Sequence, residues 1–157
     1  MCVLPNFLPV VIDEINAGGV PDEDITIVVA TGTHRAHTLE EDVLVCGQEI
    51  VNRIKIHQHD CRNNAELVDL GVTSRGTPIL IDKTVAEADK IIITGAVSLH
   101  PMAGFGGGRK AVMPGVSGHA TIMHNHAMAL ADEVGAGCNP LCETGVFGQK
   151  LTRCTRI

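Results

Sequence analysis

The sequence predicts a single α/β domain in which a mostly parallel sheet carries helices on both of its faces. Two runs of branched apolar residues suited to buried strands, at 25–30 and 90–94, support this class. Segments with a helical period precede, separate and follow these runs, and strands that alternate with helices favour parallel pairing. A chain of 157 residues with 45% hydrophobic residues is enough for one core and short for two.

The first half of the chain contains the clearest element signals. Apolar residues recur with a helical period over 4–17, and a pair of glycines follows this predicted helix. Acidic residues precede the predicted strand at 25–30. Thr38 and Glu41 form a capping-box pattern that begins a helix running towards Cys46. Gly47 interrupts that helix before a further turn.

The second half is read from shorter patterns. The elements expected there, in order, are a strand at 53–57, a weak helix at 63–70, a strand at 78–81, a helical turn at 83–88, a strand at 90–94 and a helix at 119–133. Residues 1–134 therefore form the predicted domain, and the sheet is expected to be Rossmann-like. Residues 135–157 have no sustained period and are predicted to be an irregular tail.

Composition excludes several classes of protein. A net charge of −6 disfavours a nucleic-acid partner, and the absence of Trp and Tyr removes platforms for base stacking. No apolar run approaches the roughly 20 residues of a membrane span, and the chain begins without a secretory leader pattern, so we expect a cytoplasmic protein without a membrane partner. Six cysteines without a C-x-x-C pair favour free thiols, and the spacing of Cys138 and Cys142 is weak support for a metal site.

Two histidines follow the two predicted buried strands. His34 lies in the sequence TGTHR after the first strand, and His100 lies in LHP after the second. Sites in parallel sheets form beyond the carboxyl ends of strands, and imidazole titrates near neutral pH, so both histidines are candidates for proton transfer. The alternative for each is an ordinary loop histidine bonded to nearby backbone.

The stretch AGFGGGRK at 103–110 is a candidate anion site. Unobstructed amides at Gly106, Gly107 and Gly108, followed by Arg109 and Lys110, suit the binding of an anionic group. The order differs from a Walker A loop and from the dinucleotide fingerprint. Lys110 beside Arg109 is also a candidate nucleophile for covalent attachment of a cofactor. The alternative is a flexible turn with solvated cations.

Further histidines offer weaker metal patterns. His124 and His126 are two residues apart on a predicted helix and therefore point about 200 degrees apart, which favours one metal ligand rather than a pair. His57 and His59 would share one strand face, with Asp60 as an orienting carboxylate, although a plain polar strand end is the more common reading.

Nine short motifs resemble, in their order and spacing, the lactate racemase family, the nickel-pincer nucleotide enzymes. They are TGTHR at 31–35, HD at 59–60, LGVTSRGTP at 70–78, TG at 94–95, LHP at 99–101, AGFGGGRK at 103–110, MPGVSG at 113–118, TI at 121–122 and NH at 125–126. The resemblance spans roughly residues 4–139. It implies a racemase or epimerase that moves a proton and a hydride on a small 2-hydroxy acid, together with a nickel-pincer nucleotide made by dedicated cofactor-synthesis enzymes.

The resemblance also implies roles for individual residues. Lys110 would tether the cofactor through a thioamide, and His126 would be the protein ligand of nickel. His34 and His100 would be the paired acid and base, and Arg35 or Arg109 would hold the substrate carboxylate. The glycines at 106–108 would let the backbone approach the cofactor.

The chain departs from the family pattern at three places. The acidic segment that anchors the cofactor phosphate and the second domain have no counterpart here, and the residues after Pro140 do not follow the family. We therefore expect a partial amino-terminal domain that exposes apolar surface and self-associates. The competing hypotheses are a non-catalytic phosphate-binding or small-ligand module and, ranked last, a zinc hydrolase, which needs at least three converging ligands.

Overall fold

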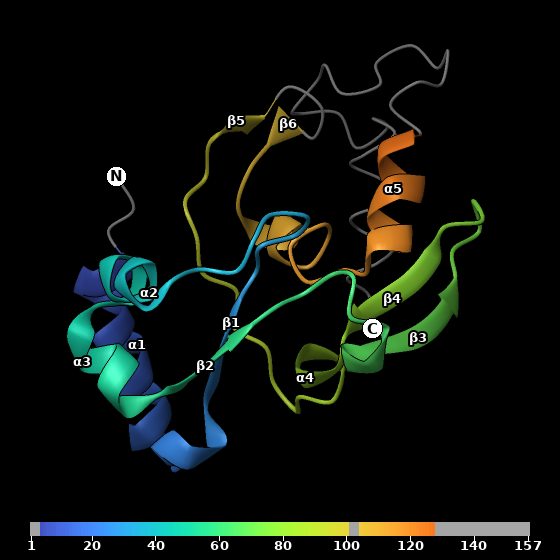
Figure 1. The fold of residues 1–157 in the computed structure, drawn as a ribbon. Coiled ribbons are helices and arrows are strands. Elements are labelled where there is room, and N and C mark those ends of the chain that lie inside the picture. The colour runs from blue at the N-terminus through green and yellow to red at the C-terminus, as the bar shows by residue number, and fades with distance from the viewer. Residues whose placement is uncertain (1–3, 101–103, 128–157) are drawn as a thin grey trace.

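The computed structural model describes residues 4–100 and 104–127, and Figure 1 shows their arrangement. The helices, including short 3-10 turns labelled η, are α1 (Leu4–Ala17), η1 (Asp22–Asp24), α2 (Leu39–Cys46), α3 (Gln48–Arg53), η2 (Asn64–Glu66), α4 (Lys83–Ala86), η3 (Gly108–Ala111) and α5 (His119–Ala127). The strands are β1 (Thr26–Val29), β2 (Lys55–Gln58), β3 (Leu67–Val72), β4 (Pro78–Asp82), β5 (Leu99–His100) and β6 (Gly104–Phe105).

The amino-terminal part is a helical layer on a pair of parallel strands. β1 and β2 pair in parallel, with Ile27 opposite Ile56, and α2 and α3 form the crossover between them. Side chains from α1, α2 and α3 form a buried cluster, against which Ile27 and Ile56 pack. Figure 1 shows these three helices together on one side of the strand pair. The predicted helix at 4–17, the capping box and the break at Gly47 are confirmed.

A second core lies on the other side of β1. Because side chains alternate along a strand, Val28 points away from the helices and packs against Ile81, Val112 and Val116. β3 and β4 form an antiparallel hairpin, and the amide of Gly118 donates to the carbonyl oxygen of Leu80 in that hairpin. The prediction that β1 is covered on both faces is thus confirmed. The helices cover one face, and the β3–β4 hairpin with the loop at 112–118 covers the other.

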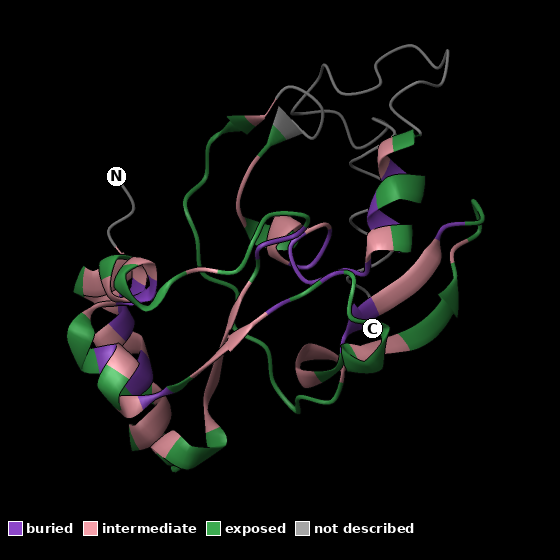
Figure 2. Ribbon diagram, viewed as in Figure 1, coloured by how far each residue is buried: buried purple, intermediate pink, exposed green. Residues whose placement is uncertain are grey.

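Two predicted elements are wrong. The segment predicted as a strand at 90–94 has no regular structure, and Ile91, Ile92 and Ile93 are 40–60% exposed. The weak helix predicted at 63–70 is a 3-10 turn followed by β3, because Val68 and Asp69 pair with β4. Figure 2 shows the continuous exposure of the 88–98 segment, where every residue is exposed.

The α/β class is confirmed, but the sheet is small. Among the described residues the only parallel pair is β1 with β2, whereas β3 with β4 and β5 with β6 pair antiparallel. The mostly parallel sheet is therefore a correction, because the apolar run at 90–94 has no strand partner. The carboxyl part of the helix predicted at 119–133 and the tail at 135–157 lie outside the described residues. Among the described residues, no helix combines the length and the apolar character that a membrane span requires.

Candidate functional site

The turn that carries His34 is fixed at the carboxyl end of β1. The hydroxyl of Thr31 donates to the carbonyl oxygen of His59 at 2.9 Å, and the amide of Gly32 donates to the carbonyl oxygen of Gly115 at 2.8 Å. Gly32 has a φ of 59°, in the left-handed region that favours glycine. Beyond these anchors His34 is exposed, and its amide donates to the carbonyl oxygen of Thr31. The imidazole is thus presented to solvent from a fixed turn.

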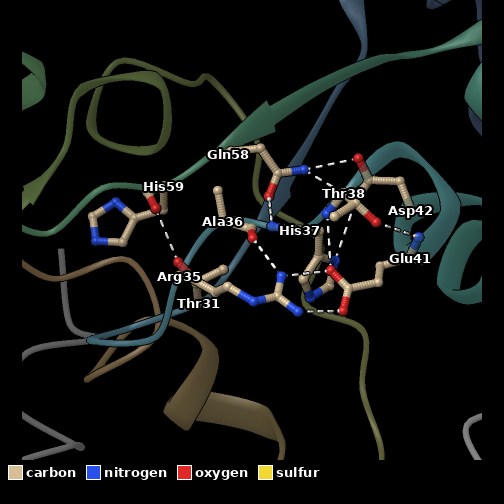
Figure 3. A network of polar contacts seen from close by, with 9 residues as sticks. All are labelled: Thr31, Arg35, Ala36, His37, Thr38, Glu41, Asp42, Gln58 and His59. Atoms are coloured by element: carbon tan, nitrogen blue, oxygen red, sulfur yellow. Dashed lines mark hydrogen bonds and ion pairs between the residues drawn. The ribbon is translucent and has the colours of Figure 1, made fainter.

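Arg35 is held by the next helix (Figure 3). Its guanidinium donates to both carboxylate oxygens of Glu41, at 2.7 and 2.6 Å, and to the carbonyl oxygen of Ala36. The hydrogen bonds that Glu41 accepts from Arg35 and from the backbone of Thr38 lower its pKa to about 2. The same carboxylate closes the capping box with Thr38. Arg35 therefore fastens its turn to α2, and binding a substrate carboxylate would require it to exchange this partner.

Figure 3 also shows a polar cluster around Asp42 that the sequence did not predict. The buried Asp42 carboxylate accepts two hydrogen bonds from the side-chain amide of Gln58, at 3.0 and 2.9 Å. His37 contributes a ring contact to Asp42 at 3.2 Å, and its backbone amide donates to Gln58. These contacts join α2 to the end of β2. An acidic residue in the first turn of a capped helix gives no sign of such a partner, so the sequence carried no usable signal.

The glycine loop packs against the end of the 88–98 segment. The amide of Gly106 donates to the carbonyl oxygen of Ser98 at 2.6 Å. A Cβ at Gly107 would lie 2.7 Å from the carbonyl oxygen of Ala96, and Gly107 has a φ of 74°. These glycines are therefore required by the fold itself, whether or not a ligand approaches them. Gly108 also has a positive φ, of 51°, and Arg109 next to it is exposed.

Lys110 and His100 lie within electrostatic reach of one another. Burial lowers the pKa of the Lys110 ammonium, which favours the neutral amine that acts as a nucleophile. Burial also lowers the pKa of His100, and the nearby charges of Lys110 and His126 lower it further. A lowered pKa keeps the imidazole neutral and able to accept a proton near pH 7. The structure thus brings together three residues that were predicted separately.

The ring of His126 is fixed in one orientation on α5. Its Nδ1 lies 2.7 Å from the carbonyl oxygen of Ile122 and donates to it, so in the neutral ring the lone pair is on Nε2. A backbone carbonyl bonded to one ring nitrogen is the usual way to orient a metal-binding imidazole. His124 instead contacts the hydroxyl of Thr77 through its Nδ1, at 3.1 Å. The different partners of these two histidines agree with the prediction that they do not act as a pair.

The motif around His57 and His59 is organised by a residue that sequence reasoning missed. Both imidazoles lie 2.9 Å from the same carboxylate oxygen of Asp82, at the end of β4. The orienting carboxylate expected at Asp60 is wrong, because Asp60 is exposed and caps its own turn. The pattern that could have marked Asp82 is its place before a short helix, where it caps α4. Only the structure brings it to β2.

The predicted site residues therefore fall into two groups. Lys110 and His126 both lie close enough to His100 for their charges to lower its pKa. His34 is on a separate turn, joined to the Lys110 loop through Gly115. Among the described residues no group of three or more His, Cys, Asp or Glu side chains is arranged to hold a metal ion, so the described part contains no ready-made three-ligand zinc centre. Cys138 and Cys142 lie outside the described residues.

A family model, the lactate racemase N-terminal domain, matches residues 4–137. This chain belongs to the lactate racemase family. The matched region is the family's amino-terminal domain and covers the predicted site residues.

Relatives agree with the family model. A lactate racemase of Lactiplantibacillus plantarum is 44% identical over 107 residues, which are 68% of this chain and 25% of that relative. A lactate racemase of Thermoanaerobacterium thermosaccharolyticum is 33% identical over 140 residues, 89% of this chain and 31% of that relative. The chain therefore spans about a quarter to a third of the lactate racemases it matches.

A solved structure also resembles this chain. The lactate racemase apoprotein from Thermoanaerobacterium thermosaccharolyticum superposes with a TM-score of 0.86 at 28% sequence identity. The superposition covers 98% of this chain and 37% of that structure. The similarity therefore extends over nearly the whole chain but only part of the solved protein.

Proposed function

We propose that this chain carries part of the active site of a racemase or epimerase that acts on a small 2-hydroxy acid of the lactate type. The single observation that carries the proposal is the convergence of His100, Lys110 and His126, each with a microenvironment suited to its role. Family membership supports the reaction class. We further propose that the domain predicted at 1–134 is Rossmann-like, with β1 and β2 as a parallel pair of its sheet.

The residues fit the nickel-pincer nucleotide that the family resemblance implies. Lys110 would tether the cofactor, since its partly buried amine has a lowered pKa and is therefore a better nucleophile than an exposed lysine. His126 would be the nickel ligand, because its Nδ1 bond to the Ile122 carbonyl fixes the ring with the lone pair on Nε2. When bound, this cofactor supplies a hydride acceptor and donor for carbon 2 of the hydroxy acid.

His34 and His100 would move the hydroxyl proton. The two enantiomers would present the hydroxyl group at different positions relative to the cofactor, so two histidines suit a racemase better than one. His100 suits the role of base, because its lowered pKa keeps Nδ1 or Nε2 unprotonated near neutral pH. The exposed His34 suits exchange of the proton with solvent.

The substrate carboxylate needs a cation. Arg35 and Arg109 are the two candidates: Arg109 is exposed beside Lys110, and Arg35 would have to exchange its bonds to Glu41 for bonds to the substrate. Gly106, Gly107 and Gly108 would form the backbone wall of the cofactor site. Gly107 and Gly108 have positive φ values, and Gly106 and Gly107 pack closely against Ser98 and Ala96, which gives that part of the wall a fixed shape.

The test is the mass and metal content of the protein made together with the cofactor-synthesis enzymes. We expect a covalent mass increment on Lys110 and bound nickel in the wild type, and neither in Lys110→Ala. Mass spectrometry of the intact protein and its peptides measures the increment, and elemental analysis measures nickel. An increment retained in Lys110→Ala would contradict the tether assignment.

A matched pair of histidine variants tests the nickel ligand. His126→Ala is expected to lose nickel, whereas His124→Ala, two residues away on α5 and bonded to Thr77, retains it. Equal losses would contradict the choice of His126. A wild type that gains neither nickel nor a mass increment, alone and in a longer polypeptide with the rest of the family's domains, would favour the phosphate-binding module.

The proposed partners follow from this function. They are a small 2-hydroxy acid and the enzymes that make the cofactor, with no nucleic acid or membrane, in the cytoplasm. Self-association is supported by the exposed apolar side chains of Ile92, Val97 and Leu99, which are 60–79% accessible. Light scattering measures it directly, and a monomer at micromolar concentrations would contradict it.

A further inference from the structure

His59 is one of the most deeply buried polar residues of the structure. It is 2% exposed, and both of its ring nitrogens are bonded. Nδ1 lies 2.9 Å from an Asp82 carboxylate oxygen, and Nε2 lies 3.0 Å from the carbonyl oxygen of Ser117. Asp82 is 1% exposed, and Ser117 is fully buried. None of these three residues has a role in the function proposed above.

The two partners of the His59 ring are both hydrogen-bond acceptors. Burial by itself raises the pKa of Asp82, but the hydrogen bonds from His59 and His57 outweigh that effect and leave the pKa below its usual value, so Asp82 is a carboxylate. A carboxylate and a carbonyl oxygen can only accept hydrogen bonds. The His59 ring therefore bridges these two acceptors inside the core, through Nδ1 and Nε2.

His59 lies between the two loops of the candidate site. On one side its backbone carbonyl oxygen accepts from the hydroxyl of Thr31, in the turn that leads to His34. On the other side Nε2 of its ring contacts the carbonyl oxygen of Ser117, in the 112–118 loop that follows Lys110. Within that loop the amide of Gly115 donates to the carbonyl oxygen of Lys110 at 3.0 Å.

We propose that His59 is a positioning residue: its ring, held between Asp82 and Ser117, fixes the 112–118 loop, and with it Lys110, against the turn that carries His34. The amide of Asp82 adds to this link by donating to the carbonyl oxygen of Val116 at 2.9 Å. A buried ring that is bonded on both sides resists displacement, because each lost bond leaves a desolvated polar group unpaired.

His57 provides a matched control within the same cluster. It donates to the same oxygen of Asp82, at the same 2.9 Å, but its ring forms no hydrogen bond with Ser117. Removing either imidazole takes one hydrogen bond from Asp82. Only removal of the His59 ring also releases the loop after Lys110. The difference between the two variants therefore measures positioning rather than general loss of stability.

The test measures how Lys110 reacts with acetic anhydride as a function of pH, in the full chain without cofactor. Peptide mass spectrometry gives the apparent pKa of each lysine from its acetylation rate, and Lys83, whose side chain is 53% exposed, is the internal reference. In His59→Phe the released loop exposes Lys110, so its apparent pKa rises towards that of Lys83. In His57→Phe the profile of Lys110 stays as in the wild type.

Two outcomes would overturn the proposal. One is an unchanged Lys110 profile in folded His59→Phe, and the other is an equal change in His57→Phe. If His59→Phe does not fold, as judged by circular dichroism, the pair His59→Gln and His57→Gln is measured in the same way and read by the same criteria.

This inference rests on the proposed function, because Lys110 matters there as the cofactor tether, but the two can fail separately. An unchanged acetylation profile would remove the positioning role while nickel and the mass increment on Lys110 still support the racemase. Absence of the increment would remove the racemase while a shifted profile still shows that His59 positions the loop.

Discussion

The 112–118 loop and the 88–98 segment both lack regular secondary structure, yet they differ completely in burial. Six of the seven residues of the loop are buried, whereas every residue of the segment is exposed (Figure 2). The segment is the more apolar of the two by sequence, with three consecutive isoleucines. Apolar composition therefore does not decide which of the two becomes core.

The difference lies in the partners of the backbone. In the loop, Gly115, Val116 and Ser117 offer carbonyl oxygens to Gly32, to Asp82 and to His59 in turn. The isoleucines of the segment have no strand beside them in the described part of the chain. A buried backbone needs its polar groups bonded, so an apolar run without such partners remains at the surface.

The largest effect is expected at the acidic residue that anchors the loop. Asp82→Asn removes the buried carboxylate that both His57 and His59 contact, which is expected to lower the free energy of unfolding by about 4 kcal/mol. Asp89→Asn is the matched change in the exposed segment and is expected to alter it by less than about 0.5 kcal/mol. Urea denaturation measures both. Equal effects would show that the two regions do not differ in this way.

The same residue predicts an acid dependence of stability. Because the pKa of Asp82 is lowered in the folded state, its contribution is fully present above the unfolded value of 3.8 and is lost as pH falls below it. Denaturation between pH 5 and pH 2 is expected to show a steeper loss in the wild type than in Asp82→Asn. Asp89→Asn should follow the wild type, and a parallel loss in all three proteins would refute the role of Asp82.

The next largest loss of stability is expected from an alanine at Gly115, with Gly95 as its matched control. A Cβ at Gly115 would collide with the carbonyl oxygen of Ala111 and lie 2.8 Å from the Cβ of Ala30, so Gly115→Ala is expected to cost about 3 kcal/mol. Gly95 has no atom within 4 Å of its ideal Cβ, and Gly95→Ala is expected to be nearly neutral. Thermal unfolding compares the two. A tolerated alanine at 115 would mean that the loop adjusts and is less constrained than its contacts indicate.

The smallest difference in stability is expected between alanine substitutions at Val116 and at Val97. Val116 is 4% exposed and Val97 is 76% exposed. Val116→Ala removes buried methyl groups and is expected to cost about 2 kcal/mol, whereas Val97→Ala is expected to cost less than about 0.5 kcal/mol. Urea denaturation midpoints measure this pair too. A substantial cost at Val97 would show that the 88–98 segment is covered in solution, as self-association would cause.

The sequence was most informative where local chemistry decides the structure. The helix at 4–17, the capping box of Thr38 with Glu41 and the break at Gly47 each depend on neighbours within a few positions, and all are confirmed. The run at 90–94 was misread because strand formation depends on a partner elsewhere in the chain. The helix predicted at 63–70 was wrong for the same reason, since pairing with β4 decides its conformation.

The candidate site shows the same difference between local patterns and contacts that join distant residues. Motif position selected His100, Lys110 and His126 as candidates, and in the structure the charges of Lys110 and His126 act on His100. It could not reveal that Glu41 engages Arg35, that Asp82 rather than Asp60 orients His57 and His59, or that Gly107 is required by the backbone of Ala96. Each of these contacts joins residues from different elements or depends on the detailed path of a loop.

The two cysteines buried in separate parts of the structure offer a way to time its motions. Cys46 lies in the helical core, and Cys61 lies where its carbonyl oxygen accepts from the amide of His119. Burial raises the pKa of both thiols, and only a thiolate reacts readily with alkylating reagents. Their labelling rates therefore report how often each part opens, so that the helical layer and the loop core can be followed as separate units of the native ensemble.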